Sequence, residues 1–454
     1  MSVRRFELLL ELYGDEDTIE IFSERATVQY WLDVESSLAL AQAELGIIGH
    51  GAASAIAVAA DAKNIDLSTL WADARNVGYP ILPLIRQLDA LLAEEHRGCV
   101  HFGATTQDIM DTGVALQVRD VAKRQDSLIQ DLGDCLADLV REHAQTMMAA
   151  RTHGQHAVPT VLGLKLAVYL DEFSRHRTRL AAAFSEVVVL ALFGAGGTSA
   201  AYGHNPVVLR ERVAGRLGLR PVDVPRHVAR DTLAALTSAE AAIAATCSRF
   251  GREVIDLSRS EIGEITEAVG HLRGASSTMP QKSNPIESEG VVGLAVCAAA
   301  QSAAMLRAME AGHERAAGEW QVEWHALPEV LILCSSAIKT LRSIVQGLRV
   351  FPERMGSNLL DHGGEVMAEA YMISLAPEIG RENAHELVYE AVRRARETHI
   401  TLFEAMVEMA PSFTQTAIRE IHPEEYLGDS VLAIEVALKN WDEGEGLLKK
   451  NGFS

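Results

Sequence analysis

The sequence predicts an all-α protein built around a bundle of long helices. Proline, which interrupts helices, is absent from three long windows, residues 160–205, 226–279 and 286–327. Two stretches within these windows, 161–190 and 230–260, are rich in Ala, Leu, Glu and Arg, which favour helix. Segments with the alternating polar and apolar pattern of strands are nearly absent.

An apolar face at helical spacing precedes the first window. Its members recur at intervals of three and four, the period of one side of a helix: Leu128, Leu132, Cys135, Leu136, Leu139 and Val140. Several of the expected helices are apolar on more than one face. Such helices belong in the centre of a bundle, and a bundle made between subunits would provide that centre.

Turn-forming residues divide the chain into three expected domains. Residues 1–104 are predicted to form an N-terminal helical domain, and residues 105–350 a central domain of long helices. Residues 351–454 are predicted to form a C-terminal domain of shorter helices. There, Asn383 and Glu386 have the spacing of a helix N-cap and its capping box.

The composition is that of an ordinary globular protein and argues against several classes of partner. The 454 residues carry a net charge of −21, so no basic excess could neutralise phosphates, and nucleic acid is not expected as a partner. No uninterrupted run reaches the roughly 18 apolar residues of a membrane span, so no membrane is expected. The N-terminus lacks the pattern of a signal peptide. The five cysteines are dispersed without a CxxC pair, which favours reduced thiols in a cytoplasmic protein.

Motifs for common cofactors are missing from the sequence as well. It has no GxGxxG segment and no P-loop, so a nucleotide cofactor is not expected. The spacing of cysteines and histidines does not match a zinc site, so no metal is expected either. Any chemistry is therefore assigned to side chains.

Residues 274–285, with the sequence GASSTMPQKSNP, form the most informative segment. Pro280 and Pro285 prevent a helix across it, and an Ala- and Val-rich helix resumes after Glu287. One interpretation is a surface loop that leads into this helix. The other is a catalytic loop with a serine base, which works only if fixed donors or a cation stabilise the alkoxide. Lys282 and the backbone N–H groups of the loop are the candidates for that stabilisation.

The pattern GxSSxMPxKxNP in this segment resembles the signature of the fumarase/aspartase superfamily of lyases. Two further segments resemble the superfamily in the right order, HFGATTQD at residues 101–108 and RTHGQHAVPT at residues 151–160. The resemblance covers nearly the whole chain. It implies a three-domain, fumarase/aspartase-like fold, in which the central domain contributes five long helices to the twenty-helix core of a homotetramer.

The resemblance also implies a mechanism. The family removes a proton α to a carboxylate and β to a leaving group, through an aci-carboxylate anion that cations and N–H donors must stabilise. The base would be Ser276 or its neighbour Ser277. The general acid would be His153, because the ordinary pKa of histidine lies near neutral. Glu289 stands where one branch has a Glu that orients this histidine, although a solvated helix residue is the alternative.

The remaining predicted site residues would hold a small dicarboxylate-containing substrate. By resemblance, Lys282 and Asn284 hold a carboxylate and the developing charge. Donors to a carboxylate are expected from the first segment, at Thr105, Thr106 and Gln107. The predicted site is completed by His101, Gln155, His156 and Arg315. For His156 a core position, and for Arg315 a surface helix start, are the alternatives. In the superfamily the three segments come from three different subunits and meet at one site.

The resemblance is closest to the branch shared by 3-carboxy-cis,cis-muconate cycloisomerase and adenylosuccinate lyase. Trp324 stands where adenylosuccinate lyases have an Arg for the nucleotide phosphate, which argues against a nucleotide substrate. The pattern HERxxGxWxxEW at residues 313–324 instead resembles the cycloisomerase. His153, however, is typical of a lyase whose leaving group needs a proton, such as an amine.

These features favour a C–N lyase that acts on an N-substituted aspartate or related succinate and releases fumarate. The first alternative is the cycloisomerase, which performs an addition–elimination with a lactone inside one molecule. The second alternative is a nitrosuccinate-type elimination. A non-enzymatic structural homologue, as in lens crystallins, belongs to another class, and the presence of all the expected catalytic residues argues against it.

Overall fold

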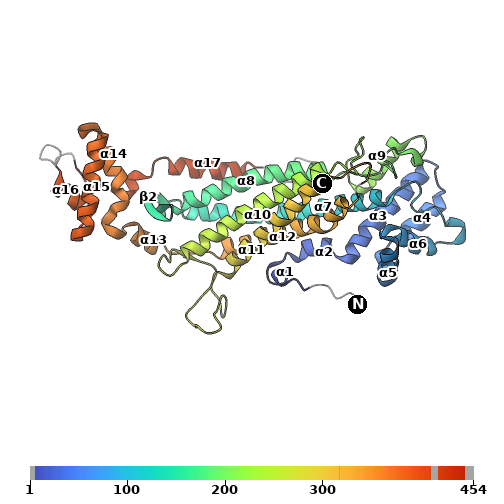
Figure 1. Ribbon diagram of the computed structural model, residues 1–454, viewed down its shortest axis with the longest axis horizontal. Helices are drawn as coiled ribbons and strands as arrows, with labels where there is room; N and C mark the ends of the chain where they lie inside the picture. The colour runs from blue at the N-terminus through green and yellow to red at the C-terminus, as the bar shows by residue number, and fades with distance from the viewer. Residues whose placement is uncertain (1–5, 316, 411–417, 445–454) are drawn as a thin grey trace.

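The computed structural model describes residues 6–315, 317–410 and 418–444. This part of the chain is mostly helical, which confirms the predicted helical class. The molecule is elongated, with the N-terminal helices at one end and helices of the C-terminal part at the other (Figure 1). The N-terminal helices are α1 (Leu8–Tyr13), α2 (Glu16–Ile21), α3 (Glu24–Glu44), α4 (His50–Ala59), α5 (Leu67–Val77) and α6 (Ile81–Ala90).

The middle of the molecule is a bundle of long helices that pack side by side (Figure 1). They are α7 (Thr106–Glu142), α8 (Leu162–Val187), α10 (Asp231–Leu257), α11 (Ile286–Ala308) and α12 (Glu319–Gly347). The predicted helical stretches 161–190 and 230–260 correspond to α8 and α10. The shorter α9 (Pro206–Leu217) lies beside α3.

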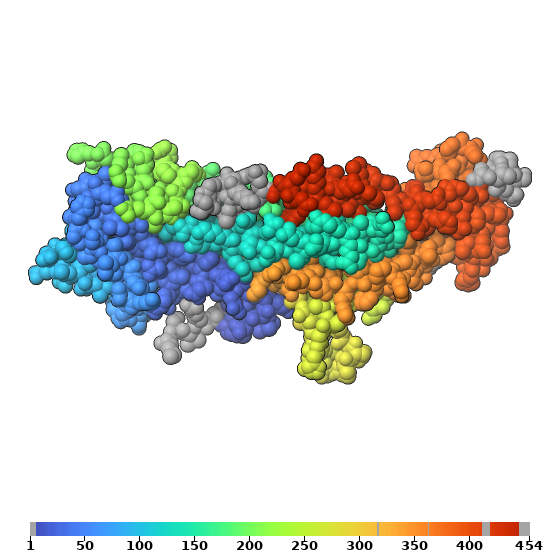
Figure 2. All heavy atoms as spheres, turned by 180° about the vertical axis from the view of Figure 1, so that it is seen from behind, coloured from blue at the N-terminus to red at the C-terminus, as the bar shows by residue number. Residues whose placement is uncertain are grey.

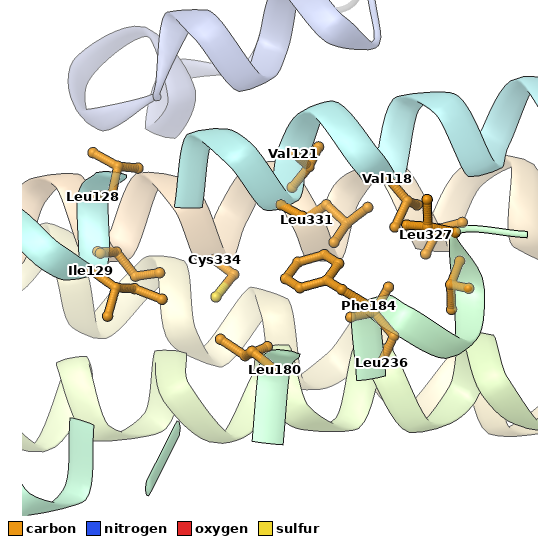
Figure 3. Close-up of a cluster of buried hydrophobic side chains, with 14 of the residues drawn as sticks. Val118, Val121, Leu128, Ile129, Leu180, Phe184, Leu236, Leu327, Leu331 and Cys334 are labelled. Carbon is orange, nitrogen blue, oxygen red and sulfur yellow. The ribbon is translucent and has the colours of Figure 1, made fainter. Parts of the chain in front are cut away.

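Apolar side chains from the bundle helices meet in one continuous core (Figure 3). Burying each large apolar side chain contributes about 1.5–3 kcal/mol, so this core is a main source of stability. Figure 3 labels Val118, Val121, Leu128 and Ile129 of α7, Leu180 and Phe184 of α8, Leu236 of α10, and Leu327, Leu331 and Cys334 of α12, all of them buried.

Helix α7 runs the length of the bundle. Its 37 residues place its ends about 55 Å apart, at 1.5 Å per residue. It begins with a capping box, in which the Thr105 N–H donates to Asp108 Oδ2 at 3.1 Å. Gly133 lets the last helix, α17 (Ser430–Asp442), approach, because a Cβ there would lie 1.9 Å from the Trp441 ring.

The far end of the molecule has a core of its own, formed by α13 (Pro352–Leu359), α14 (Ala368–Ile379), α15 (Arg381–Thr398) and α16 (Leu402–Met409). Helix α15 begins at Arg381, so the predicted N-cap at Asn383 was wrong. Asn383 lies inside the first turn, where its Nδ2 donates to Ile379 O at 2.8 Å. The predicted domain boundaries at 104 and 350 stay predictions.

Two short antiparallel strand pairs were not predicted. β1 (Met147–Thr152) and β2 (Gln155–Val161) form a hairpin that contacts α13. β3 (Ile265–Thr266) pairs with β4 (Arg349–Val350). These segments lack clear alternation of polar and apolar residues, so their sequence carries little strand signal.

Helices α11 and α12 are long and apolar enough, by length and composition alone, to cross a membrane. Neither helix is an uninterrupted apolar run, because each contains polar residues. Core helices of globular proteins share this length and composition, and α12 is largely buried against its neighbours. The predicted absence of a membrane partner stays a prediction.

Candidate active site

The start of α7 and the segment after α11 form a hydrogen-bonded polar cluster around the guanidinium of Arg315. Arg315 Nη2 donates to Thr105 Oγ1 at 2.9 Å, and Arg315 Nε donates to Gln107 Oε1 at 3.1 Å. The guanidinium is thereby fixed at the N-terminal end of a long helix, where the helix dipole adds positive potential. The structure therefore brings together three residues predicted for the site: Thr105, Gln107 and Arg315. Thr106 lies in the first turn of the same helix.

Gln107 is fully buried, and its amide N–H groups already have partners inside the protein. Nε2 donates to His227 O at 2.8 Å and to Asp111 Oδ2 at 3.2 Å. In this structure Gln107 thus orients Arg315, and its predicted role as a direct carboxylate donor stays a prediction.

The neighbouring Asp108 holds the helix start in place. Its buried carboxylate accepts from the backbone N–H of Phe193 and of Gly194 at 2.9 and 2.8 Å. It also accepts from Tyr202 Oη at 2.9 Å and lies 3.0 Å from His227 Nε2. Burial of the phenol and this carboxylate both raise the pKa of Tyr202, so the hydroxyl stays protonated. These contacts fix the register of α7 relative to its surroundings.

His101 is paired with a buried acid that the sequence did not single out. Its Nδ1 lies 2.6 Å from Glu35 Oε1 of α3. Burial of the ring disfavours its charge, but the Glu35 carboxylate outweighs burial and raises the pKa of His101 above 6.5. The hydrogen bond also fixes the orientation of the ring. Glu35 gives no signal in the sequence, because a Glu within an α-helix is ordinarily solvated.

His153 lies at the tip of the β1–β2 hairpin. His153 and Gly154 form a two-residue turn with φ values of 52° and 75°, so both adopt left-handed backbone conformations. The hairpin is anchored by Arg151, whose guanidinium forms a two-pronged contact with the buried Glu264 at 2.5 and 3.0 Å. The side chains at the tip are exposed, including three predicted site residues: His153, Gln155 and His156.

The predicted catalytic loop extends away from the bundle between α10 and α11 (Figures 1 and 2). Asn284 closes its base, since its backbone N–H and its Nδ2 donate to Gly274 O at 2.8 and 3.0 Å. Ser276 Oγ accepts from the backbone N–H of Thr278 at 3.3 Å and of Met279 at 3.1 Å. No such donors to the neighbouring Ser277 hydroxyl occur among the described residues.

Two residues predicted for the site, the cation Lys282 and the acid Glu289, are open to solvent. A different acid, Glu267, accepts from the backbone N–H of Ser288 at 2.6 Å and of Glu287 at 3.3 Å at the start of α11. Glu267 therefore caps this helix, a role that the sequence did not indicate.

The three predicted segments do not meet within one chain. Thr105 and Gln107 lie at the start of α7, whereas His153 follows its far end, about 55 Å away along the helix. The loop with Ser276 leaves the bundle from its side (Figure 1). One chain therefore supplies each element of the predicted site, but in separate places.

An aromatic cavity of about 710 Å³ lies beside the start of α7. Its walls include Tyr79, Trp320 and Trp324, together with Asp111 and Glu323 of a buried ion cluster. Arg230 contacts Asp111 at 2.8 Å and both oxygens of Glu323. Of these residues, the sequence pattern at 313–324 had included Trp320, Glu323 and Trp324, whereas Tyr79, Asp111 and Arg230 were not singled out.

Comparison with known proteins identifies the family of this chain. A profile of a lyase family matches residues 14–299. The chain belongs to the fumarase/aspartase superfamily of lyases. It is therefore an enzyme of this superfamily.

Members of the superfamily with known activities resemble the chain along most of its length. The 3-carboxy-cis,cis-muconate cycloisomerase of Pseudomonas aeruginosa is 37% identical, covering 92% of this chain and 93% of that protein. The adenylosuccinate lyase of Pyrococcus horikoshii is 34% identical, covering 95% and 97%. The crystal structure of the 3-carboxy-cis,cis-muconate lactonizing enzyme from Pseudomonas putida superimposes with a TM-score of 0.89, at 33% identity, covering 96% of this chain and 99% of that one.

Proposed function

We propose that this superfamily lyase cleaves the C–N bond of an N-substituted aspartate and releases fumarate, with Ser276 as the base. Ser276 removes the proton α to one carboxylate, and the electron pair forms the C=C bond as the C–N bond breaks. The amine departs with a proton from His153. The observation that carries the choice of base is the pair of backbone N–H donors directed at Ser276 Oγ, and His153 supports the choice of a C–N bond.

These donors distinguish Ser276 from Ser277. An alkoxide forms at neutral pH only when fixed donors or cations hold the charge. Thr278 and Met279 present such donors to Ser276 at 3.3 and 3.1 Å without further rearrangement. Lys282, in the same loop, would add positive charge once substrate and loop come together.

The cluster at the start of α7 suits the other half of the reaction. Proton removal leaves an aci-carboxylate with two negative charges on one group. Arg315 is held by Thr105 and Gln107 at a helix N-terminus, a place that favours anions. A charged His101, supported by Glu35, would add a second cation there.

The proposal includes an assembly in which copies of the chain share each site. A small substrate cannot bridge groups that one chain holds about 55 Å apart. Helix α11 also leaves apolar side chains uncovered, among them Val296 at 59% and Leu306 at 53% exposure. Packing this face against other copies in a homotetramer would bury it.

Replacing each serine separately tests the base. Ser276→Ala is expected to lower fumarate release by about a thousandfold or more, because the described loop holds no other base with such donors. Ser277→Ala is the matched control and should retain most activity, with circular dichroism confirming that both variants fold. Near-full activity of Ser276→Ala would refute the assignment.

Replacing His153 tests the bond that breaks. An amine expelled without a proton is a very poor leaving group, whereas nitrite departs as a stable anion. His153→Asn should therefore slow an amine-releasing aspartate far more than nitrosuccinate. Equal losses on both substrates would show that His153 only positions the substrate.

A second candidate function is 3-carboxy-cis,cis-muconate cycloisomerase. It is favoured by the 37% identity to the Pseudomonas aeruginosa enzyme and by the similarity to the Pseudomonas putida structure. The same preparation can be assayed for interconversion of 3-carboxymuconate and its lactone. Lactone formation without fumarate release from any substituted aspartate would replace the first proposal by the second.

A further inference from the structure

The aromatic cavity is connected to the carboxylate-binding cluster through one glutamine. Gln107 accepts from Arg315 and donates to Asp111, which lies on the cavity wall one helical turn further along α7. The cavity volume of about 710 Å³ falls in the range of small-molecule pockets. The cavity wall at Asp111 therefore lies about one turn of α7 from the glutamine that holds Arg315.

Six of the residues that line the cavity are aromatic. Tyr79 stacks on Trp320 with ring centres 6.0 Å apart and planes at 23°. Trp324 meets both rings edge-on, at 6.0 Å from Tyr79 and 5.1 Å from Trp320. Trp31 and Trp71 line the cavity as well, with centres 6.4 Å apart. Such walls favour a flat apolar group, which can stack on one ring and contact the edge of another.

The charge of two carboxylates in these walls opposes a phosphate. Asp111 and Glu323 face a single buried cation, Arg230, so the cluster carries one excess negative charge when both acids are ionised. Trp320 donates its indole N–H to Asp111 Oδ1 at 3.2 Å, and so presents carbon atoms to the cavity. Arg75 also lines the cavity, but its side chain is exposed, where water screens its charge.

We infer that this cavity holds the leaving-group half of the substrate, and that this half is an uncharged aromatic or similarly apolar group. The inference rests on the proposed function for the identity of the other half, a succinyl unit. A substrate of this class is N-benzylaspartate. Its C–N bond would break to give fumarate and benzylamine, with the proton from the succinyl carbon taken by the base and one proton delivered to the amine.

Benzylsuccinate separates binding from chemistry. It carries the dicarboxylate and a phenyl ring, but a C–C bond replaces the C–N bond, so no amine can leave. Calorimetry on the full chain should show benzylsuccinate binding about tenfold or more tightly than succinate. Trp324→Ala should reduce this preference to about threefold or less. Tyr389→Ala, an exposed aromatic on α15, is the matched control and should leave the preference unchanged.

A second variant keeps the inference testable if Trp324→Ala does not fold. Val114→Trp, from the α7 wall, would fill the cavity and should remove the benzyl preference while succinate still binds. Equal affinity of the wild-type protein for benzylsuccinate and succinate would overturn the inference, as would a preference that survives Val114→Trp.

Turnover of N-benzylaspartate, measured in parallel, distinguishes the inference from the proposed function. Fumarate release without any benzyl preference in binding would overturn the inference and leave the function intact. A benzyl preference that depends on Trp324, without fumarate release from any substituted aspartate, would support the inference and refute the function.

Discussion

Glu240 provides a test of how the bundle core responds to pH. It lies fully buried in α10, where Gln125 Nε2 donates to its Oε2 at 3.0 Å. Its Oε1 has no hydrogen-bond partner among the described residues. Burial raises the pKa of Glu240 from the usual 4.5 to about 7, and the interactions with Cys334 and Gln125 oppose this only in part. We predict that Glu240→Gln makes the free energy of unfolding less sensitive to rising pH.

The sign and the size of the effect follow from the two pKa values. The folded state binds the proton more tightly than the unfolded chain, so unfolding releases it between pH 4.5 and about 7. The protonated Glu240 carboxyl therefore makes its full contribution to stability below pH 4.5, and this contribution is lost as the pH rises to about 7. Because each pH unit is worth about 1.4 kcal/mol, the loss amounts to about 3 kcal/mol.

Urea unfolding at several pH values and one fixed chain concentration measures this effect. The difference in unfolding free energy, Glu240→Gln minus wild type, should rise by about 3 kcal/mol between pH 4.5 and pH 8. Glu435→Gln, an exposed acid on α17, makes the same chemical change and should show no such rise. A pH-independent difference for Glu240→Gln would refute the reasoning.

Two further predictions concern packing and buried charge. Gly133→Ala should destabilise the protein by about 1–2 kcal/mol, because overlap with the Trp441 ring outweighs a helix-propensity gain of about 1 kcal/mol. In the matched control Gly215→Ala the new Cβ meets open space, so the melting temperature should hold or rise. Arg230→Met should cost about 3–5 kcal/mol, because it leaves two buried carboxylates without their cation. Arg307→Met, which removes an exposed ion pair, should change the melting temperature little, and equal losses in both Arg variants would contradict this argument.

The long helices could be predicted from sequence because local residue preferences, for helix formers and against proline, largely determine them. Windows without proline and rich in helix formers predicted α8 and α10 closely. The β1–β2 hairpin was missed, since its stability comes from the contact with α13 and from the ion pair between Arg151 and Glu264. The start of α15 was misplaced because Asn383 bonds within the helix rather than capping it.

The sequence motifs named candidate site residues, but not the groups that hold them in place. The loop motif named Ser276 together with Ser277, and the backbone donors that separate the two became visible only in three dimensions. Likewise, Glu35 lies 66 residues before His101, and no local pattern links two groups so distant in sequence. Ion clusters such as that of Arg230 join separate helices, so they too depend on the fold.

The turn at the hairpin tip limits how this enzyme can evolve. At φ 52°, position 153 accepts few residues without strain, and besides Gly these are mainly Asn, Asp and His. Codons for Asn and Asp each differ from a His codon by a single base. One mutation can therefore remove the titratable ring from His153 and keep the hairpin intact. With the proton-donor role that we propose for His153, a lineage could in this way move from leaving groups that require a proton to leaving groups that depart as anions, without rebuilding the fold around them.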